Sequence, residues 1–305
     1  MQPKAEIVDL RFDLYGTKPE YITVGGRQSL WVTCAANTEV VGLMRDGSIE
    51  HYPVDATPNQ IALGGESIWF TMPIIDTVGR FDHDGTIHNC KLPDGSHPTG
   101  IATAGDDAWV TLSATGEVAR VALDGSATVV RPVVTGDDQL TDPAPADPRF
   151  VAVDDRGSLW FTRYGRADIV RMDADGTTES WTSPECAAPF GLAVDTEAVW
   201  IADYGNGGIW RIGRAEKLLQ RVEPWPKGVA IEIASDQQGG CWFTEINEDL
   251  VGHIDADAKL TEYDISSYGT KPRGLAIDRD GVAWVVLWSG GIIGIPRPEG
   301  EIHVL

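Results

Sequence analysis

The sequence predicts an all-β protein: a seven-bladed β-propeller with four antiparallel strands in each blade. The first observation is a tryptophan followed by β-forming residues, which recurs as LWVT, IWFT, AWVT, LWFT, VWIA, CWFT and AWVV. The second is the spacing of these tryptophans, which lie 38, 40, 51, 40, 42 and 42 residues apart in a chain of 305. They are Trp31, Trp69, Trp109, Trp160, Trp200, Trp242 and Trp284. Seven copies of one unit cover the chain, so we expect a single domain over residues 1–305.

Each unit holds four short runs of β-forming residues. In the third unit they are GIATA, AWVTL, EVARVAL and ATVVRP, separated by turn signals at residues 105–107 and at Asp124-Gly125. No helical period competes with this pattern. A proline precedes the first run of every unit, and we place these prolines at Pro19, Pro58, Pro98, Pro148, Pro189, Pro226 and Pro272.

The two ends of the chain resemble each other. Residues 5–22 mirror residues 260–277, and YGTKP occurs at 15–19 and again at 268–272. We therefore expect an N-terminal strand at residues 4–12 that pairs with the last blade and protects its edge. Residues 301–305 also match the outermost strand of the last repeat. The two ends of the chain therefore either share that edge of the last blade or add a fifth strand to it. The 51-residue interval predicts an insertion loop at 135–147 before blade 4, either a lid or a solvated insertion.

Charge and composition exclude several classes of protein. With 24 Lys and Arg against 46 Asp and Glu, the formal charge is -22, which opposes binding to nucleic acid. No run is long and apolar enough for a membrane span, and no secretory signal is visible, so we expect a cytoplasmic protein without membrane partners. The four cysteines lie far apart, which favours free buried thiols over disulfides or zinc ligands. We expect no cofactor and no bound metal, and oligomeric state is left open.

Candidate ligand-binding residues follow from propeller geometry. The residue after each proline and the residues three or four places after each tryptophan meet at one mouth of the channel. Four cations fall there on an otherwise acidic chain, and they indicate a site for an anionic small molecule: Arg149, Arg163, Lys227 and Arg273. The alternative is that some of them pair internally with Glu20, Asp203 or Glu245.

Aromatic residues surround the same mouth and favour an organic ligand with flat or apolar parts. The candidates are Tyr164, Tyr204, Trp225 and Trp288. We assign Phe150 and Phe190 to packing between blades. For a general base the candidates are His97, Glu20, Asp203 and Glu245. His97 is the one histidine at the right end and the best histidine candidate, although a lone histidine in such a place is more often a surface residue than a catalyst.

The repeat resembles the streptogramin lyase (virginiamycin B lyase) family, most closely in SIWFTMPIIDTVGRF at 67–81 and CWFTEINEDLVGHI at 241–254. The resemblance implies a seven-bladed propeller that linearises a cyclic depsipeptide by magnesium-dependent elimination. It also implies a histidine after the proline in the last two blades, and carboxylates before the proline and four past the tryptophan in the final blade. In this sequence the two implied histidine positions hold Lys227 and Arg273. The two implied carboxylate positions hold Lys271 and Trp288. We therefore do not expect a true magnesium-dependent streptogramin lyase.

Three hypotheses result. The first is a divergent streptogramin-lyase-like enzyme that acts on an anionic, partly aromatic or apolar small molecule by elimination, isomerisation or ring opening. The second is a non-catalytic propeller that binds a ligand or a protein. The third is a metal-dependent lactonase-type propeller, resting on Glu20 and Asn59 beside Asp203 or Glu245.

Overall fold

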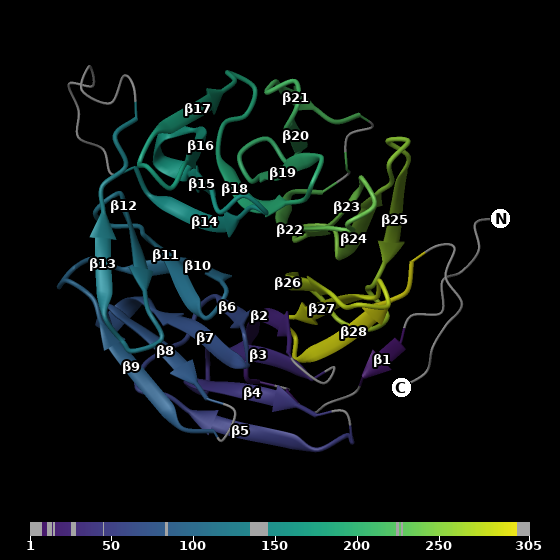
Figure 1. Ribbon diagram of the computed structural model, residues 1–305. Helices are drawn as coiled ribbons and strands as arrows, with labels where there is room; N and C mark the ends of the chain where they lie inside the picture. Colours follow the sequence, from purple (N-terminus) through teal and green to yellow (C-terminus); the bar gives the residue numbers. More distant parts are fainter. Residues whose placement is uncertain are drawn as a thin grey trace.

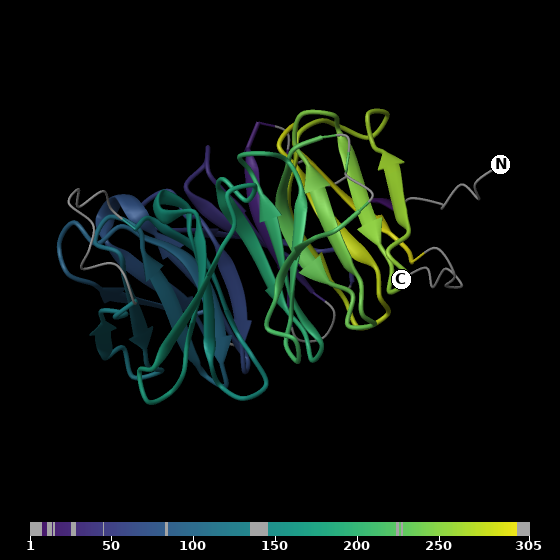
Figure 2. The same cartoon turned by 90° about the horizontal axis from the view of Figure 1, so that it is seen from above.

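The chain forms seven four-stranded antiparallel sheets arranged in a ring around a central channel (Figure 1). The computed structural model describes residues 8–10, 14, 16–25, 29–44, 46–82, 85–134, 146–223, 226 and 228–297. Seen from the side, the sheets stand next to one another as blades (Figure 2). The predicted seven-bladed β-propeller is confirmed.

Each blade runs outward from an innermost strand to an outermost one. Blades 1 to 3 consist of β2 Pro19–Val24, β3 Leu30–Cys34, β4 Glu39–Leu43 and β5 Ile49–Pro53; β6 Ile61–Gly64, β7 Ser67–Met72, β8 Thr77–Phe81 and β9 Ile87–Lys91; and β10 Pro98–Ala104, β11 Asp107–Leu112, β12 Glu117–Val121 and β13 Ala127–Val130. Blades 4 and 5 consist of β14 Pro148–Val153, β15 Leu159–Arg163, β16 Asp168–Met172 and β17 Thr178–Thr182; and β18 Pro189–Val194, β19 Ala198–Asp203, β20 Ile209–Gly213 and β21 Leu219–Arg221. Blade 6 consists of β22 Ala230–Ser235, β23 Cys241–Glu245, β24 Leu250–Ile254 and β25 Leu260–Asp264, and blade 7 of β26 Pro272–Ile277, β27 Ala283–Leu287, β28 Gly291–Ile295 and the N-terminal β1 Val8–Leu10. Two short 3-10 turns, η2 Pro73–Ile75 and η4 Tyr164–Arg166, follow β7 and β15.

The ring is closed by the beginning of the chain. β1 pairs antiparallel with β28, with Val8 opposite Gly294 and Leu10 opposite Ile292. Blade 7 therefore takes three strands from the end of the chain and its outermost strand from the start. The expected role of residues 301–305 and the insertion at 135–145 lie outside the described residues.

The threonine two places after the tryptophan joins neighbouring blades. Thr162 Oγ1 accepts the N–H of Phe150 in its own blade at 3.2 Å and donates to the carbonyl oxygen of Phe190 in the next blade at 2.8 Å. The same N–H to hydroxyl bond joins Tyr21 to Thr33, Gly100 to Thr111 and Glu232 to Thr244. The bond satisfies an N–H beside the irregularity where the innermost strand pairs with the second strand.

Three of the repeated tryptophans bond to the turn before them. Trp160 and Trp200 donate their indole N–H to Asp154 and Asp195, each at 3.1 Å, and Trp284 donates to Asp278 at 2.8 Å. These tryptophans are almost fully buried. In these three blades the recurring tryptophan is thus a core residue with a satisfied polar group, and it occurs once in each blade, at a period of about forty residues.

The structure corrects the start of blade 6. Ala230 lies opposite Glu245, as Pro148 lies opposite Arg163 and Pro189 opposite Asp203 in blades 4 and 5. The innermost strand therefore begins at Ala230, four residues after Pro226. Ala230 therefore takes the place that a proline holds in blades 4 and 5, and Ile231 is the residue that follows it. The prediction that Lys227 holds this second place is wrong.

Two further predictions concern the cysteines and membrane-spanning segments. Cys34, Cys90, Cys186 and Cys241 are free and buried, as predicted. Burial raises the pKa of the Cys34 thiol to about 12, so it stays protonated at neutral pH. The described residues contain no helix with the length and apolar character needed to span a membrane.

Candidate functional site

The channel has two chemically different mouths. Strands β2, β10, β14, β18 and β26 begin with a proline at one end, which we call the proline mouth. The same strands and β22 end at the opposite mouth, next to the turns that carry Asp154, Asp195, Asp236 and Asp278. We call this end the aspartate mouth. The predicted ligand residues belong to the proline mouth.

Three cations surround one indole ring at the proline mouth. Lys18 Nζ, Lys271 Nζ and Arg273 Cζ lie 5.2, 4.9 and 5.4 Å from the centre of the Trp288 ring. We call these four residues the cationic cluster. Among the described residues, neither lysine has a carboxylate within ion-pair distance. The cluster therefore concentrates positive charge on a protein of net charge -22.

The two lysines come from the repeated YGTKP segments. Each precedes its proline in the left-handed backbone region, with φ of 51° at Lys18 and 56° at Lys271. Their carbonyl oxygens accept the backbone N–H of Ala35 and Trp288, at 3.0 and 3.1 Å. These bonds fix the two segments at the boundary between blades 1 and 7. Neither lysine was a candidate from the sequence, although the repetition of YGTKP marked both.

Glu20 is the carboxylate of this cluster. Its Oε2 atom lies 3.5 Å from Arg273 Nε, and both side chains are partly buried. Burial raises the pKa of Glu20, while Arg273, the Trp288 indole N–H and Lys18 oppose the rise. Glu20 is therefore a carboxylate whose proton affinity exceeds that of an exposed glutamate, in contact with a cation.

Aromatic side chains form the opposite side of the mouth. Tyr164, Phe190 and Tyr204 have ring centres 6.0 to 6.5 Å apart, and we call them the aromatic wall. Tyr204 is 44% exposed and open to a ligand. Arg149 lies over the Tyr164 ring at 5.8 Å and pairs with Asp147 at 2.8 Å. Arg149 is thus a partly neutralised cation beside the wall.

The channel is filled just below the mouth. Tyr21 of blade 1 and Phe150 of blade 4 have ring centres 6.2 Å apart, and Phe150 packs on Phe190 at 5.2 Å. Phe150 is buried, which agrees with its predicted packing role, whereas Phe190 both packs and forms part of the aromatic wall. A ligand at this mouth would rest on an aromatic floor.

Arg163 is not available to a ligand. It is 3% exposed and forms a two-pronged pair with Asp168 across β15 and β16, with Nε 2.8 Å from Oδ1. The alternative reading, in which a predicted cation pairs internally, is correct for this residue, although its partner is Asp168. The pair joins the end of β15 to the start of β16, where Arg163 lies opposite Asp168.

Asp203 and Glu245 are also structural. Both are fully buried. Asp203 accepts backbone N–H groups from Ala187, Ala188 and Gly205, at 2.9 to 3.2 Å. Glu245 accepts the N–H of Gly228. Neither carboxylate contacts the space in which a ligand would lie, so the structure does not support them as general bases.

His97 lies on an exposed turn of blade 3. Its backbone N–H donates to Asp76 Oδ1 at 2.8 Å, and Ser113 Oγ lies 3.4 Å from its ring atom Nδ1. These contacts join the loops of blades 2 and 3. They hold His97 in the loop that precedes β10. Of the general-base candidates His97 and Glu20, it is Glu20 that contacts the cationic cluster, through Arg273. Trp225 and Lys227 lie outside the described residues.

One channel residue was missed from the sequence. Glu232 occupies the position of Tyr21 and Phe150, because its N–H bonds to Thr244 as theirs bond to Thr33 and Thr162. Counting from the tryptophan would have found it: six of the chosen prolines precede their tryptophan by 11 or 12 residues, but Pro226 precedes Trp242 by 16.

The residues present do not fit a magnesium ion. Where the resemblance implies ligands, the structure places Ile231, Lys271, Arg273 and Trp288. Cations and apolar groups do not coordinate Mg²⁺, which requires oxygen ligands. Among the described residues, no group of three or more His, Cys, Asp or Glu side chains could hold a metal ion. The two carboxylates that the lactonase hypothesis places beside Glu20 and Asn59 have other roles, because Asp203 and Glu245 accept backbone N–H groups.

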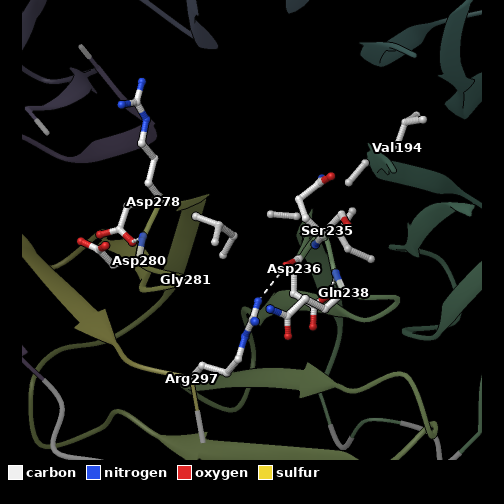
Figure 3. A pocket seen from close by; sticks show the side chains of 14 residues that line it. Val194, Ser235, Asp236, Gln238, Asp278, Asp280, Gly281 and Arg297 are labelled. Carbon is white, nitrogen blue, oxygen red and sulfur yellow. Dashed lines mark hydrogen bonds between the residues drawn. The ribbon is translucent and has the colours of Figure 1, made fainter. Parts of the chain in front are cut away.

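A cavity of about 570 Å³ opens at the aspartate mouth (Figure 3). Ends of β18, β22 and β26 line it, and Arg297 reaches across to donate to the carbonyl oxygen of Asp236 at 2.7 Å. The Asp236 and Asp278 carboxylates already accept bonds from His253 and from the turns they cap. The cavity is therefore lined by acids that have structural roles.

The fold and the repeat define the class: a tryptophan-repeat, seven-bladed β-propeller with a cationic and aromatic mouth. The chain belongs to the virginiamycin B lyase family, whose model matches residues 1–136 and 133–304. It is similar to the virginiamycin B lyase of Nocardia farcinica, with 29% identity over 281 residues that cover 90% of this chain and 78% of the relative.

Solved structures agree on the fold. A streptogramin B lyase structure superposes with a TM-score of 0.84 at 23% identity, covering 94% of this chain and 96% of the other. A catalytically inactive virginiamycin B lyase from Staphylococcus aureus with quinupristin gives 0.86 at 22% identity, covering 96% and 99%. A hydrazine synthase from Kuenenia stuttgartiensis gives 0.76 at 17%, covering 94% and 97%. At these low sequence identities the structural similarity is evidence for the fold alone.

Proposed function

We propose that the protein is a divergent enzyme of the virginiamycin B lyase family. It acts on an anionic, partly aromatic or apolar small molecule at the proline mouth. The observation that carries this proposal is the cationic cluster, which lies at the same mouth as the aromatic wall. One side attracts the anionic group and the other accepts a flat or apolar group.

The reaction class follows from Glu20 and Arg273. Glu20 removes a proton from the carbon next to a substrate carbonyl, and the electron pair moves to the carbonyl oxygen. Arg273 stabilises the negative charge that develops there. When that charge collapses, either a leaving group departs, which is elimination or ring opening, or the proton returns elsewhere, which is isomerisation. The raised pKa makes Glu20 a stronger base than an exposed glutamate.

The test is turnover of a panel of aromatic carboxylates and cyclic peptides, with quinupristin among them. Elimination that opens a ring leaves the mass unchanged, so products are followed by chromatography coupled to mass spectrometry. We expect Glu20→Gln to abolish turnover of a hit with little change in binding, and Arg273→Ala to weaken both. Glu66→Gln, an exposed glutamate of blade 2, is the control for loss of one charge. Unchanged turnover in both mouth variants would show the site assignment to be wrong.

Magnesium gives a second check. We expect that quinupristin is not linearised faster with added Mg²⁺, because the positions implied for magnesium ligands hold Arg273, Lys271 and Trp288. The measurement is the rate of product formation with Mg²⁺ against the rate with a chelator. A strict Mg²⁺ requirement would contradict the assignment of charge stabilisation to Arg273.

A non-catalytic ligand-binding propeller is the second candidate. The observation that favours it is the replacement of the implied catalytic set by Ile231, Lys271, Arg273 and Trp288. A panel compound that binds the wild-type protein and is recovered unchanged, with Arg273→Ala affecting affinity alone, would favour this candidate over the enzyme.

A further inference from the structure

The residue before the proline has the same backbone conformation in four blades. Its φ lies in the left-handed region, at 51°, 56°, 48° and 56° for Lys18, His97, Asp147 and Lys271. In blade 4 a side chain at this position reaches the one two residues further on, because Asp147 Oδ2 lies 2.8 Å from the guanidinium of Arg149. The position therefore places a side chain at the proline mouth, beside the residue that follows the proline.

Blade 7 carries two like charges where blade 4 carries an ion pair. Lys271 precedes the proline and Arg273 follows it, and their charged ends lie 4.9 and 5.4 Å from the centre of the Trp288 ring. Asp249 approaches Lys271, but its Oδ1 atom accepts the backbone N–H of that residue at 2.6 Å. Two cations at one ring repel each other, and an anion bound between them offsets that repulsion.

Lys18 adds a further positive charge from blade 1. Its Nζ atom lies 5.2 Å from the same ring centre. In the described part of the chain, the carboxylate within ion-pair distance of the cationic cluster is Glu20, which lies 3.5 Å from Arg273 Nε. Glu20 therefore offsets Arg273, and the two lysine charges remain.

The same mouth also lacks hydrogen-bond acceptors. Arg273 Nε is buried, and no described residue accepts a hydrogen bond from it. Each lysine ammonium has three N–H donors, and both side chains are exposed at the mouth. A ligand that satisfies this mouth brings two negative charges and several acceptor oxygens.

A phosphate monoester has this chemistry. It carries close to two negative charges at neutral pH, on three strong acceptor oxygens, whereas a carboxylate or a sulfate ester carries one. Lysine binds phosphate as a compact charge, with shorter and stronger hydrogen bonds than neutral donors make. The organic part of such an ester reaches the aromatic wall, where Tyr204 is 44% exposed.

We propose that the anionic group of the ligand at the proline mouth is a phosphate monoester, held by Lys18 and Lys271 beside Arg273, and that the ligand is the phosphate ester of an aromatic or apolar alcohol. The inference rests on the proposed function, because it names the substrate class of the same site. Glu20 and Arg273 then remain available to the reacting carbon and its carbonyl oxygen.

The experiment compares 2-naphthyl phosphate with 2-naphthyl sulfate, which have the same shape and differ by one charge at about pH 8. Affinities are measured by titration calorimetry at fixed ionic strength, with a chelator present so that no divalent metal bridges the phosphate. We expect wild-type protein to bind the phosphate roughly tenfold more tightly than the sulfate, because the second charge interacts with a second lysine. We expect Lys18→Met and Lys271→Met each to remove most of this preference, and Lys259→Met, at the exposed residue before β25, to keep it.

The outcomes separate this inference from the proposed function. Equal binding of phosphate and sulfate by wild-type protein, or an unchanged preference in both Lys18→Met and Lys271→Met, overturns the phosphate assignment. If Arg273→Ala still weakens binding of both compounds in that case, the proposed site stands. If neither compound binds, or both bind Arg273→Ala as tightly as wild-type protein, the site and the inference fail together.

Discussion

At the scale of single residues, the tryptophan motif is a set of hydrogen bonds between strands and blades. Trp160 supplies apolar area and bonds to Asp154, and Thr162 bonds to Phe150 and to the next blade. In this blade the polar atoms that the motif buries have partners. Blades 5 and 7, with Ala202 and Val286 in place of the threonine, show that two of the seven blades form without this hydroxyl.

Removing the threonine hydroxyl in blade 4 should be costly. We expect Thr162→Val to lower the free energy of unfolding by about 1–3 kcal/mol, because the Phe150 N–H and Phe190 carbonyl would lose their buried partner. Chemical denaturation measures the loss. Thr128→Val, on the exposed outermost strand β13, is the matched control and should change little. Equal effects of the two substitutions would disprove the bridging role.

Glu232 gives a pH-dependent prediction for stability. A carboxyl group whose pKa is raised by folding holds its proton in the native state after the unfolded chain has released it. Stability therefore falls as pH rises from the unfolded value of 4.5 toward the raised native value. We expect Glu232→Gln to match wild-type protein at or below pH 4.5 and to be the more stable of the two at higher pH. Thermal unfolding across this range measures the difference, and a constant difference would contradict the burial of a neutral carboxyl group.

At the scale of elements, the innermost strands position the site and β1 closes the ring. Lys18 and Glu20 flank the start of β2, and Lys271 and Arg273 flank the start of β26. The cationic cluster therefore depends on the contact between the first and last blades. The pairing of β1 with β28 holds the last blade in place from its outer edge.

Deleting residues 1–10 should expose the β28 edge. We expect a lower midpoint of thermal unfolding and concentration-dependent association, because an unpaired edge strand offers free N–H and C=O groups to another chain. Light scattering and calorimetry of the shortened protein check this. A shortened protein as stable and as monodisperse as the full chain would show that β1 contributes little to closure.

At the scale of the whole molecule, charge is distributed unevenly. The chain carries a net charge of -22, yet the proline mouth gathers Lys18, Lys271 and Arg273 around one indole ring. The acids of the aspartate mouth are committed to turns and to tryptophan bonds. An anionic ligand is therefore attracted to one end of the channel and repelled by most of the remaining surface.

The sequence was sufficient for the fold because the repeat period and the strand pattern recur seven times and support each other. It also predicted that Arg273, Glu20, Trp288 and the tyrosines of the wall lie at one mouth, because the innermost strands start in register in blades 1, 4, 5 and 7; their role toward a ligand stays a prediction. The predicted register of blade 6 was wrong because Ala230 stands where a proline marks the start of the innermost strand in those four blades. The roles of Arg163, Asp203 and Glu245 depend on burial and on partners in neighbouring loops, which spacing alone does not show.

The most direct measurement is binding of 2-naphthalenesulfonate to Arg273→Ala and to Arg279→Ala, which remove one arginine from each mouth. Stabilisation by the probe is followed by thermal shift at fixed ionic strength. The proposed site predicts that Arg273→Ala loses the stabilisation and that Arg279→Ala keeps it. Loss in Arg279→Ala with full retention in Arg273→Ala would place the ligand in the cavity at the aspartate mouth and contradict the account.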